Sequence, residues 1–336
     1  MTSPSDFLKT LYPIGLLDDG HERVEEMRIP VHGPSAQYAI TLFEGLMGYP
    51  IDGGSAIGIV ALREHFRRLL DGAMKSDLGF DRDPAKLERL IWRSMDEIEN
   101  LILINGVKGP VYIRPTLYHD GTGNVCLGPA LEGDIHLAVY LQKWDGYLAA
   151  KPEGQQVLIS PYLKAASPVA HLKCSANYGL GIPVKKEARR QGYDEVIFRD
   201  EHLRIAEASS QNVIADLGGR LVTPDHEGLD GRPSPVLPGI TLRILRETVA
   251  PSLGLEIVED AIHPEALFGP ACEGIALCGT ASEVRHVGAL SAKSGPASTA
   301  RRAFDGPSAP LRALMEGYAR LTRGEAYREW LTVIPL

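Results

Sequence analysis

Cysteine is scarce in this chain, and its spacing excludes the common cysteine-based sites. Among the 336 residues, the four cysteines are Cys126, Cys174, Cys272 and Cys278. They form neither a CxxC pair nor a Cys/His ligand spacing, and Glu64-His65 is not part of an HExxH pair. We therefore expect no bound metal, and a protein with reduced, buried thiols, which favours a cytoplasmic location.

Long apolar runs and an excess of positive charge are also absent. No apolar run approaches the ~18 residues of a membrane helix, and no basic start leads into an apolar stretch as in a signal peptide. The formal net charge of −8 at pH 7 offers no basic surface to nucleic acid or anionic lipid. We therefore expect small molecules, and neither nucleic acid nor a membrane, as binding partners.

What is present is an ordinary globular composition, with 44% hydrophobic and 23% charged residues. A chain of 336 residues has room for about two domains. Polar residues and glycines around 143–156 predict an interdomain linker. This leaves an N-terminal α/β domain at 1–142 and a C-terminal domain at 157–336.

Local patterns predict a mixture of helices and strands, and hence an α/β (α+β) fold. Helical spacing of apolar residues predicts helices from Arg63 to Leu78, from Asp83 to beyond Ile102, from Gly239 to Val249, and near 310–323. Short strands are predicted near 111–117, 135–141, 157–161, 195–199, 212–216, 220–223 and 274–278. Gly218-Gly219 predicts a hairpin, and the Ser, Ala and Gly content from Leu290 to Ser308 predicts a surface loop.

Two motifs carry the groups that an aldehyde cofactor with a cationic ring nitrogen requires. They are Lys173-Cys174-Ser175-Ala176-Asn177-Tyr178 and Ala206-Glu207-Ala208-Ser209-Ser210-Gln211-Asn212. Such a cofactor, pyridoxal 5'-phosphate (PLP), needs a lysine for its Schiff base and an anion beside its ring nitrogen. Lys173 and Glu207 are the candidates for these two roles. Taken alone, each is more commonly an ordinary surface or turn residue.

A third segment can bind a phosphate. Leu237-Pro238-Gly239-Ile240-Thr241 leads into a predicted helix, whose first backbone N–H groups are free to bind an anion. Thr241 and Thr280 add hydroxyl groups, and Arg63 can add a charge-assisted contact from another helix start. By themselves, simple helix initiation and an exposed helix arginine are the commoner interpretations.

Together these motifs resemble the fold-type IV PLP enzymes and, within them, the branched-chain amino acid aminotransferases. The likeness extends from about Tyr38 to Trp330-Leu331-Thr332. Its further segments are Tyr38 to Gly45, Leu62-Arg63-Glu64-His65-Phe66, Tyr112-Ile113-Arg114-Pro115 and Gly279-Thr280-Ala281. The resemblance implies a two-domain fold of the D-amino acid aminotransferase type, PLP as the cofactor and at least a homodimer.

The resemblance also implies a role for each site residue. Lys173 would be catalytic, and the cofactor-binding residues would be Arg63, Tyr178, Glu207, Ser210, Leu237, Ile240, Thr241 and Thr280. Substrate would meet Tyr38, Phe43, Tyr112, Arg114, Tyr147, Thr280 and Ala281. The implied reaction is ping-pong transamination between a hydrophobic, branched-chain-like L-amino acid and 2-oxoglutarate, as in amino-acid biosynthesis.

Three departures from the family pattern leave the substrate open. The glycine-rich turn after the glutamate is replaced by Ala208-Ser209-Ser210-Gln211, as in the D-amino acid branch. Leu46-Met47-Gly48 stands where a basic residue is common, and the approach from Trp144 to Lys173 is shortened. The alternatives within the fold are a D-amino acid or (R)-amine transaminase and an aminodeoxychorismate lyase, against which Tyr112-Ile113-Arg114 argues.

Two readings from other classes are weaker. A nicotinamide-dependent oxidoreductase would need G-x-G-x-x-G between a strand and a helix, and neither Gly53-Gly54 with Gly58 nor Gly121 with Gly123 completes it. A non-catalytic binding protein of the same fold would not need the lysine, the glutamate and the phosphate turns together.

Overall fold

The computed structural model describes residues 9–121, 133–144, 151–226, 234–293 and 299–336. These residues divide into two compact units. Unit 1 takes the described residues of Met1–Tyr147 together with Leu172–Ala176 and Thr322–Leu336, and unit 2 takes those of Leu148–His171 and Asn177–Leu321. The short segment that carries Lys173 therefore belongs to unit 1, although it comes late in the sequence.

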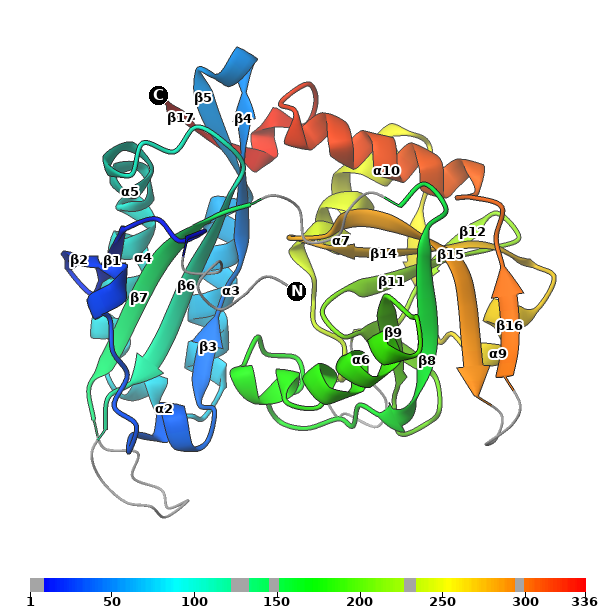
Figure 1. Cartoon of the computed structure of the whole chain (residues 1–336), viewed down its shortest axis with the longest axis horizontal. Helices are drawn as coiled ribbons and strands as arrows, with labels where there is room; N and C mark the ends of the chain where they lie inside the picture. Colours follow the sequence, from blue (N-terminus) through cyan, green and yellow to red (C-terminus); the bar gives the residue numbers. More distant parts are fainter. Residues whose placement is uncertain (1–8, 122–132, 145–150, 227–233, 294–298) are drawn as a thin grey trace. The chain divides into compact units, whose positions relative to one another are not determined.

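Unit 1 is built on an antiparallel sheet in the order β17-β5-β4-β6-β7-β1-β2, with β3 paired to β6 (Figure 1). Its strands are β1 (Ile14–Leu17), β2 (Gly20–Arg23), β3 (Thr41–Phe43), β4 (Leu46–Ile51), β5 (Ala56–Val60), β6 (Val111–His119), β7 (Ile135–Lys143) and β17 (Leu331–Pro335). The strands predicted near 111–117 and 135–141 are confirmed as β6 and β7. Alternate side chains of β7, from Ile135 to Leu141, are buried, as expected for a strand with one covered face.

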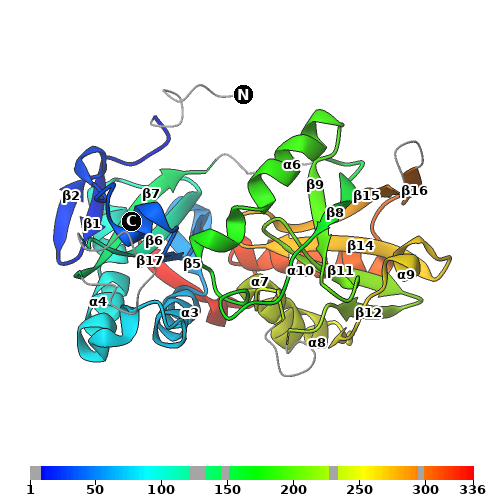
Figure 2. The ribbon, with the colours of Figure 1, turned by 90° about the horizontal axis from the view of Figure 1, so that it is seen from below.

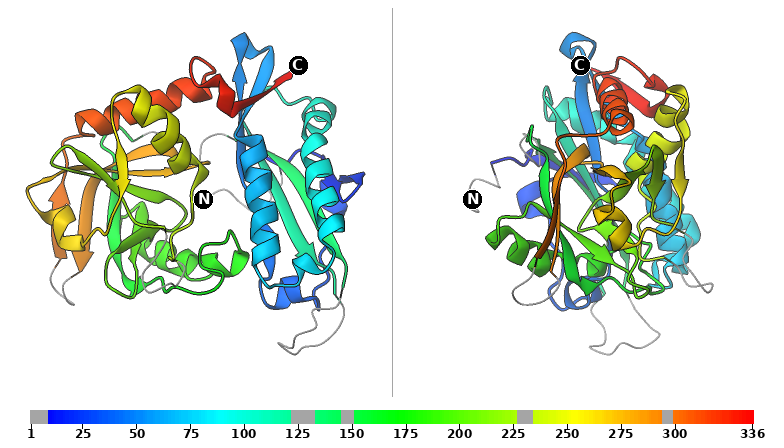
Figure 3. Two further views of the ribbon diagram at one scale, coloured as in Figure 1. Left: turned by 180° about the vertical axis from the view of Figure 1, so that it is seen from behind. Right: turned by 90° about the vertical axis from the view of Figure 1, so that its right-hand side faces the viewer.

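The helices of unit 1 cover one face of this sheet. They are α2 (Pro34–Gln37), α3 (Leu62–Lys75), α4 (Pro84–Asp96) and α5 (Ile98–Ile104), with short 3-10 turns η1 (Val24–Glu26), η2 (Asp52–Gly54), η3 (Phe80–Arg82) and η6 (Arg328–Trp330). Helices α3 and α4 lie side by side (Figures 2 and 3). The helix predicted from Arg63 is confirmed as α3. The single helix predicted after Asp83 is wrong in one respect: it is interrupted at Glu97, whose ψ of −7° ends α4 before α5 begins.

Unit 2 contains a mixed sheet in the order β10-β9-β8-β15-β14-β11-β12-β13, with β16 paired to β15. Its strands are β8 (Gln155–Leu163), β9 (Glu195–Arg199), β10 (Ile205–Ala208), β11 (Asn212–Leu217), β12 (Arg220–Thr223), β13 (Ile257–Glu259), β14 (Cys272–Gly279), β15 (Glu283–Lys293) and β16 (Thr299–Ala303). The five strands predicted in this region are confirmed as β8, β9, β11, β12 and β14. Gly218 and Gly219, with φ of 68° and 83°, form the predicted hairpin between β11 and β12.

Both faces of the central strands of unit 2 are buried. On β8, Val157 and Ile159 join the larger apolar core, whereas Leu158 between them packs with Val184 and Ala188 of α6 (Gly181–Arg190). A strand buried on both faces reads as a continuous apolar run rather than as an alternating one. Figure 2 shows α6 on one side of these strands, and α7 (Ile240–Ile244) and α8 (Ala250–Ser252) on the other.

Two predictions in unit 2 need correction. The helix predicted from Gly239 to Val249 consists of α7 followed by a π-helical turn, η5 (Leu245–Val249), and then α8. Pro251, in the first turn of α8, has no N–H for an i→i−4 bond, which interrupts the regular α-helical pattern at this point. The surface loop predicted from Leu290 to Ser308 is wrong over part of its length. Strand β15 extends to Lys293, and strand β16 (Thr299–Ala303) pairs with it. Strand β16 is an exposed edge strand, a position where charged residues are common.

The remaining helical segments of unit 2 are α9 (Pro264–Phe268), α10 (Ala309–Thr322) and the 3-10 turn η4 (Ser175–Tyr178), which spans the border of the two units. Helix α10 confirms the helix predicted near 310–323. Within the ranges that the structure describes, no helix combines the length and the apolar character needed to cross a membrane.

Candidate functional site

Lys173 is held in unit 1 as a short extension of strand β3. The N–H of Phe43 donates to the carbonyl of Lys173 at 3.1 Å, and Leu42 and Cys174 form an antiparallel bridge. The hydroxyls of Thr41 and Ser175 are also hydrogen-bonded. Lys173 is half-buried, and its Nζ lies 5.0 Å from the centre of the Phe43 ring. The backbone of Lys173 is therefore held by its pairing with β3.

The residue after β3, Glu44, belongs to an ionic cluster in which the carboxylate and His65 are fully buried and Arg68 is partly buried. Glu44 is 0% exposed, and its carboxylate accepts hydrogen bonds from Arg68 Nε at 2.6 Å and from Arg68 Nη2 at 2.8 Å. His65 Nδ1 lies 2.7 Å from the second oxygen of Glu44. Arg68 and His65 stand three residues apart on α3, so both reach the same buried carboxylate.

The pKa values of both Glu44 and His65 are lowered in this cluster, for different reasons. Burial alone raises the pKa of Glu44, but the Arg68 guanidinium and His65 outweigh it and hold that pKa well below its usual range. Burial lowers the pKa of His65, the Glu44 carboxylate opposes this, and the positive charges of Arg68 and Lys173 add to the lowering. The influence of Lys173 places the candidate lysine within electrostatic reach of the cluster. The pairing with Arg68 and His65 therefore favours the ionised form of Glu44.

Arg114 lies on β6 between two aromatic rings. Its guanidinium carbon is 4.5 Å from the centre of the Phe43 ring and 5.0 Å from that of Tyr112. Its Nε is buried, and no described residue accepts a hydrogen bond from that atom. Tyr112 in turn stacks on Trp144, with ring centres 5.3 Å apart. The predicted substrate residues Phe43, Tyr112 and Arg114 are thus brought together.

Gly45 makes this arrangement possible. A Cβ on Gly45 would lie 2.0 Å from the hydroxyl oxygen of Tyr112, so any side chain there would displace the tyrosine. Where a basic residue is common in the family, Met47 is 1% exposed and pairs with Tyr112 across β4 and β6. Met47 is therefore a buried apolar side chain at a position where the family commonly has a basic residue.

Three further predicted residues lie apart from this group or outside the described ranges. Tyr38 is half-buried at the end of α2. Tyr147 lies outside the described residues. Arg63 is exposed on α3 and stacks on Trp92, with its guanidinium carbon 5.3 Å from the ring centre. Arg68, which the sequence analysis did not single out, lies five residues further along the same helix and pairs with Glu44.

Glu207 is the central residue of the unit 2 set. It lies on β10 and is 6% exposed. One carboxylate oxygen is paired with Lys164 Nζ, and the other accepts the backbone N–H of Leu237 at 2.8 Å. Lys164 follows β8 and was not predicted. Its partner stands 43 residues away in the sequence, so no local pattern reveals the pair.

The segment around Leu237 joins Glu207 to the helix start that was predicted to bind phosphate. Asn212 Nδ2 donates to the carbonyl of Leu237 at 2.9 Å, and a Cβ on Gly239 would lie 1.9 Å from Asn212 Oδ1. Gly239 is the N-cap of α7 and no side chain caps that end, so the first N–H groups of Ile240 and Thr241 are available to an anion. A single hydrogen-bonded network therefore orients both the carboxylate and the candidate phosphate turn.

Thr241 and the turn of Thr280 and Ala281 complete the predicted unit 2 set. Thr241 is 3% exposed and hydrogen-bonds to Tyr318, a buried residue of α10. Burial raises the pKa of Tyr318, so its hydroxyl is neutral and can donate to Thr241. Thr280 and Ala281 lie in the tight turn between β14 and β15, beginning after Gly279.

The serine turn after Glu207 rests on a buried ion pair. Lys185 of α6 is paired with Glu195 and also lies 3.2 Å from Ser209 Oγ. Gln211 Nε2 donates to the same oxygen of Glu195 at 3.2 Å. Ser210 itself is exposed, and its carbonyl lies 3.2 Å from the position of a Cβ on Gly279. The Ser209-Ser210 turn, which departs from the family pattern, is therefore hydrogen-bonded to Lys185 and lies beside the turn that contains Thr280.

Tyr178 ends η4, directly after Asn177, whose side-chain Nδ2 donates to the carbonyl of Val169 at 2.7 Å. The side chain of Tyr178 is half-buried. Burial raises the pKa of the Cys174 thiol, so the cysteine next to Lys173 stays protonated and inert.

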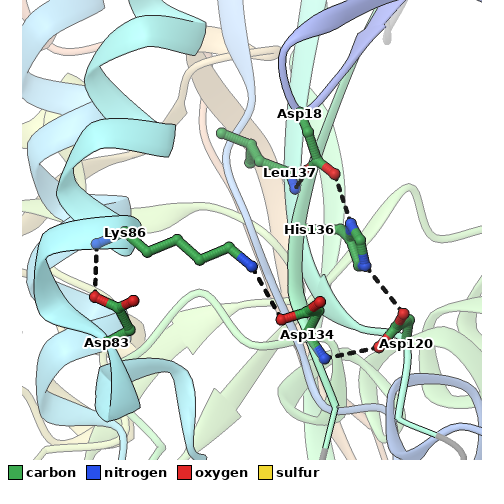
Figure 4. Close-up of polar contacts among 7 residues, drawn as sticks. All are labelled: Asp18, Asp83, Lys86, Asp120, Asp134, His136 and Leu137. Atoms are coloured by element: carbon green, nitrogen blue, oxygen red, sulfur yellow. Dashed lines mark hydrogen bonds and ion pairs between the residues drawn. The ribbon is translucent and has the colours of Figure 1, made fainter.

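A separate charged cluster lies on β7 of unit 1 (Figure 4). His136 Nδ1 lies 2.6 Å from Asp18 and its Nε2 lies 3.1 Å from Asp120. Among the described residues no group of three His, Cys, Asp or Glu side chains has a disposition suited to a metal ion. We interpret the His136 cluster as structural, because it connects β7 to the residues that follow β1 and β6.

The donor set fits PLP in its chemistry. Unit 1 offers an amine and an arginine at the start of α3, and unit 2 offers a buried carboxylate, an uncapped helix start and two hydroxyl-bearing turns. The cradle at Gly239, which a Cβ would fill, is of the kind that a phosphate approaches closely.

The comparisons with known proteins agree with this donor set. A family model described as amino-transferase class IV matches residues 41–290. A branched-chain-amino-acid aminotransferase of Salmonella typhimurium is 29% identical over 279 residues, covering 79% of this chain and 81% of the relative. A probable branched-chain-amino-acid aminotransferase of Aquifex aeolicus is 26% identical over 317 residues, covering 93% of each chain.

Solved structures show the same fold. The branched-chain aminotransferase of Thermoproteus uzoniensis, solved with norvaline, has 25% identity and a TM-score of 0.78, covering 96% of this chain and 99% of that one. The Escherichia coli branched-chain amino acid aminotransferase has a TM-score of 0.79 at 24% identity, covering 95% and 98% of the two chains. The predicted fold-type IV architecture is confirmed by these matches.

Proposed function

The chain belongs to the class IV aminotransferase family, and from this premise we propose that it transfers the amino group of a hydrophobic, branched-chain-like L-amino acid to 2-oxoglutarate. Aminotransferases of this class use PLP and act on amino acids and 2-oxo acids. The observation that carries the finer proposal is Arg114, a guanidinium held between Phe43 and Tyr112 with its Nε unpartnered among the described residues.

When bound, PLP supplies an aldehyde that condenses with amines and a ring that accepts the electrons released at the substrate α-carbon. Lys173 would provide the amine that holds the cofactor, and its Nζ would take up the proton released from the substrate α-carbon. The hydrogen bond from Phe43 to the carbonyl of Lys173 fixes the backbone from which this side chain reaches. The aromatic face of Phe43 beside Nζ limits water around the amine.

Glu207 is proposed to accept a hydrogen bond from the protonated ring nitrogen. Its second oxygen is already held by Leu237, so the carboxylate is oriented before the cofactor arrives. The phosphate would go to the N–H groups at the start of α7 and to the hydroxyls of Thr241 and Thr280. The Tyr178 hydroxyl would meet the phenolic oxygen, and Ser210 would add a contact from the turn.

For the arginine that binds phosphate we propose Arg63, at the start of α3, because Arg68 on the same helix is already paired with Glu44. Arg63 is exposed and stacked on Trp92, whereas Arg68 is turned toward Glu44. The Glu44 carboxylate orients the Arg68 guanidinium in two hydrogen bonds.

The same site must accept both an aliphatic side chain and the distal carboxylate of glutamate. Phe43, Tyr38 and Tyr147 would contact the aliphatic part, and Arg114 would pair with the distal carboxylate. The α-carboxylate would go to the hydroxyl of Tyr112 and the N–H groups of Thr280 and Ala281. Met47, which is buried, leaves Arg114 as the proposed cation for this end of the substrate.

The visible spectrum of the purified protein tests this proposal. We expect added PLP to give a yellow protein that L-leucine and L-glutamate bleach in separate single-turnover trials, and that D-alanine and an (R)-arylalkylamine do not. Bleaching by D-alanine or by the amine alone would instead assign the chain to a sister branch and make Ser209 and Ser210 the first residues to exchange.

A matched pair of lysine variants identifies the residue responsible. Lys173→Ala should take up PLP without forming the yellow species and should lose turnover, whereas Lys186→Ala, on the exposed side of α6, should behave as the natural chain. A Lys173→Ala variant that still bleaches with L-leucine would contradict the assignment. We further propose a cytoplasmic homodimer that serves branched-chain amino acid biosynthesis.

A further inference from the structure

A cavity of about 440 Å³ lies in unit 2. Its lining comes from the ends of β8 and β9, from β15 and β16, and from α9. Among the described residues, none that we propose for the cofactor or the substrate lines it. The cavity is therefore lined by other residues than the proposed cofactor site, although Arg199 pairs with Ile205 on β10, the strand that carries Glu207.

The floor of the cavity is apolar. Ile159 belongs to the main core of unit 2, and Phe268 and Ala292 pack against that core. Pro161 and Pro264 add two rigid apolar rings to the wall. A cavity of this size and lining is suited to a metabolite with a hydrocarbon body, since such pockets commonly measure roughly 300–1,000 Å³.

One cationic side chain in the cavity lacks a partner. Arg199, the last residue of β9, lines the cavity, and its Nε is buried without a hydrogen-bond acceptor among the described residues. The adjacent acid is already used, because Asp200 is paired with Arg204 at 2.6 Å. A buried polar atom left without a partner costs free energy, which a ligand or a water molecule relieves by accepting its hydrogen bond.

The other charged groups of the lining leave a net positive charge. Lys293 on β15 and Glu265 on α9 are both exposed at the cavity and carry opposite charges. Arg199 is therefore the uncompensated charge, and its planar group matches a carboxylate in two parallel hydrogen bonds. The apolar floor together with the guanidinium of Arg199 suits a ligand that has a hydrocarbon chain and a carboxylate.

We propose that this cavity binds a small aliphatic carboxylic acid, with the carboxylate on Arg199 and the hydrocarbon chain against Ile159 and Phe268. The site is distinct from the proposed site of transamination and does not depend on Lys173. Its ligand would share the chemical character of the proposed substrates, an apolar chain that ends in a carboxylate, without taking part in their reaction.

Isothermal titration of the PLP-loaded full chain with hexanoate tests this assignment, with hexanamide as the uncharged counterpart. Hexanoate bound at the cofactor changes the visible absorption and is counted separately. We expect Arg199→Met to weaken the second binding event by about tenfold or more, as for the loss of a hydrogen bond to a charged group. Arg199→Lys should weaken it less, and Arg301→Met, an exposed arginine on β16, should leave it unchanged.

A crystal of the same protein soaked with 6-bromohexanoate locates the ligand through the bromine signal. The assignment predicts bromine beside Phe268 in the natural chain and none there in Arg199→Met. Arg199→Met should keep the visible spectrum and the turnover of the natural chain, which also shows that it folds. Hexanoate affinity equal in the two proteins, equal binding of hexanamide, or bromine only at the cofactor would overturn the proposal.

Discussion

Glu44 in unit 1 and Glu207 in unit 2 are both buried carboxylates, but they differ in the hydrogen bonds that their oxygens accept from neighbouring residues. Glu44 is 0% exposed and is bound by the two donors of Arg68 and by His65. Glu207 is 6% exposed and has one lysine and one backbone N–H. The first carboxylate accepts three side-chain hydrogen bonds, whereas the second has one oxygen paired with a single lysine ammonium group.

The difference indicates two separate tasks for one residue type. A carboxylate whose acceptor positions are taken by an arginine and a histidine can only orient those partners. A carboxylate held on one oxygen by Leu237, and on the other by the partly exposed Lys164, can exchange the lysine for a cofactor. On this account Glu44 serves stability and positioning, whereas Glu207 serves the chemistry.

The largest expected effect is on activity and comes from Glu207. In Glu207→Gln the ring nitrogen of PLP loses its anionic partner, so we expect turnover to fall about 10²–10³-fold, as for other preorganised electrostatic contacts. The thermal midpoint of the PLP-free protein should change little, because the glutamine carbonyl oxygen still accepts from the N–H of Leu237 and the partly exposed Lys164 can be hydrated instead. Single-turnover kinetics and a thermal melt measure the two effects. If Glu207→Gln kept full activity but had a lowered thermal midpoint, Glu207 would be the structural carboxylate and the account would be contradicted.

The next effect is on stability and comes from Glu44. In Glu44→Ala the Arg68 and His65 side chains stay buried without their anion, which should lower the free energy of unfolding by roughly 3–5 kcal/mol. Denaturant unfolding of the PLP-free protein measures this loss. The control is Asp52→Ala, which removes an exposed carboxylate paired with Arg328 and should have no measurable effect. Equal midpoints for the two variants would refute the structural role of Glu44.

The smallest expected effect is on thermal stability and concerns His136, whose side chain is only partly buried (Figure 4). The hydrogen bond to Asp18 raises the pKa of His136, burial opposes this, and Asp120 raises it further. Because the folded pKa lies above the unfolded value of about 6.5, the stabilisation is complete below that pH and is lost as the pH rises through the folded pKa.

His136→Gln should therefore lower the thermal midpoint by a few degrees at about pH 5, and by less at about pH 9. The exposed His32 provides the control, and His32→Gln should show no such dependence. A loss that grows as the pH rises would mean that His136 is neutral in the folded protein.

The sequence alone predicted those parts of the fold that local pattern determines. The strands β9 and β12 and the hairpin at Gly218-Gly219 follow from residues adjacent in the chain. Strand β16 was missed because an exposed edge strand of Thr, Ala and Arg carries little apolar signal. The π-helical turn before Pro251 depends on backbone geometry that apolar periodicity does not record.

The same limit applies to the candidate site. Lys173, Glu207 and the turn at Gly239 stand in recognisable motifs and were found. Arg68 and Lys164 were missed because their partners are 24 and 43 residues away, and only the fold brings each pair together. The helical period offered one usable signal, since Arg68 follows His65 by three residues on the buried face of α3.

The central claim, that Lys173 is the amine that holds the cofactor, is tested most directly by locating the labelled lysine. The PLP-loaded protein would be reduced with borohydride and digested, and the modified peptide identified by mass spectrometry. The account predicts the phosphopyridoxyl group on Lys173, with Lys164 and Lys185 unmodified. A label on Lys164, or no label on any lysine of a protein that binds PLP, would contradict it.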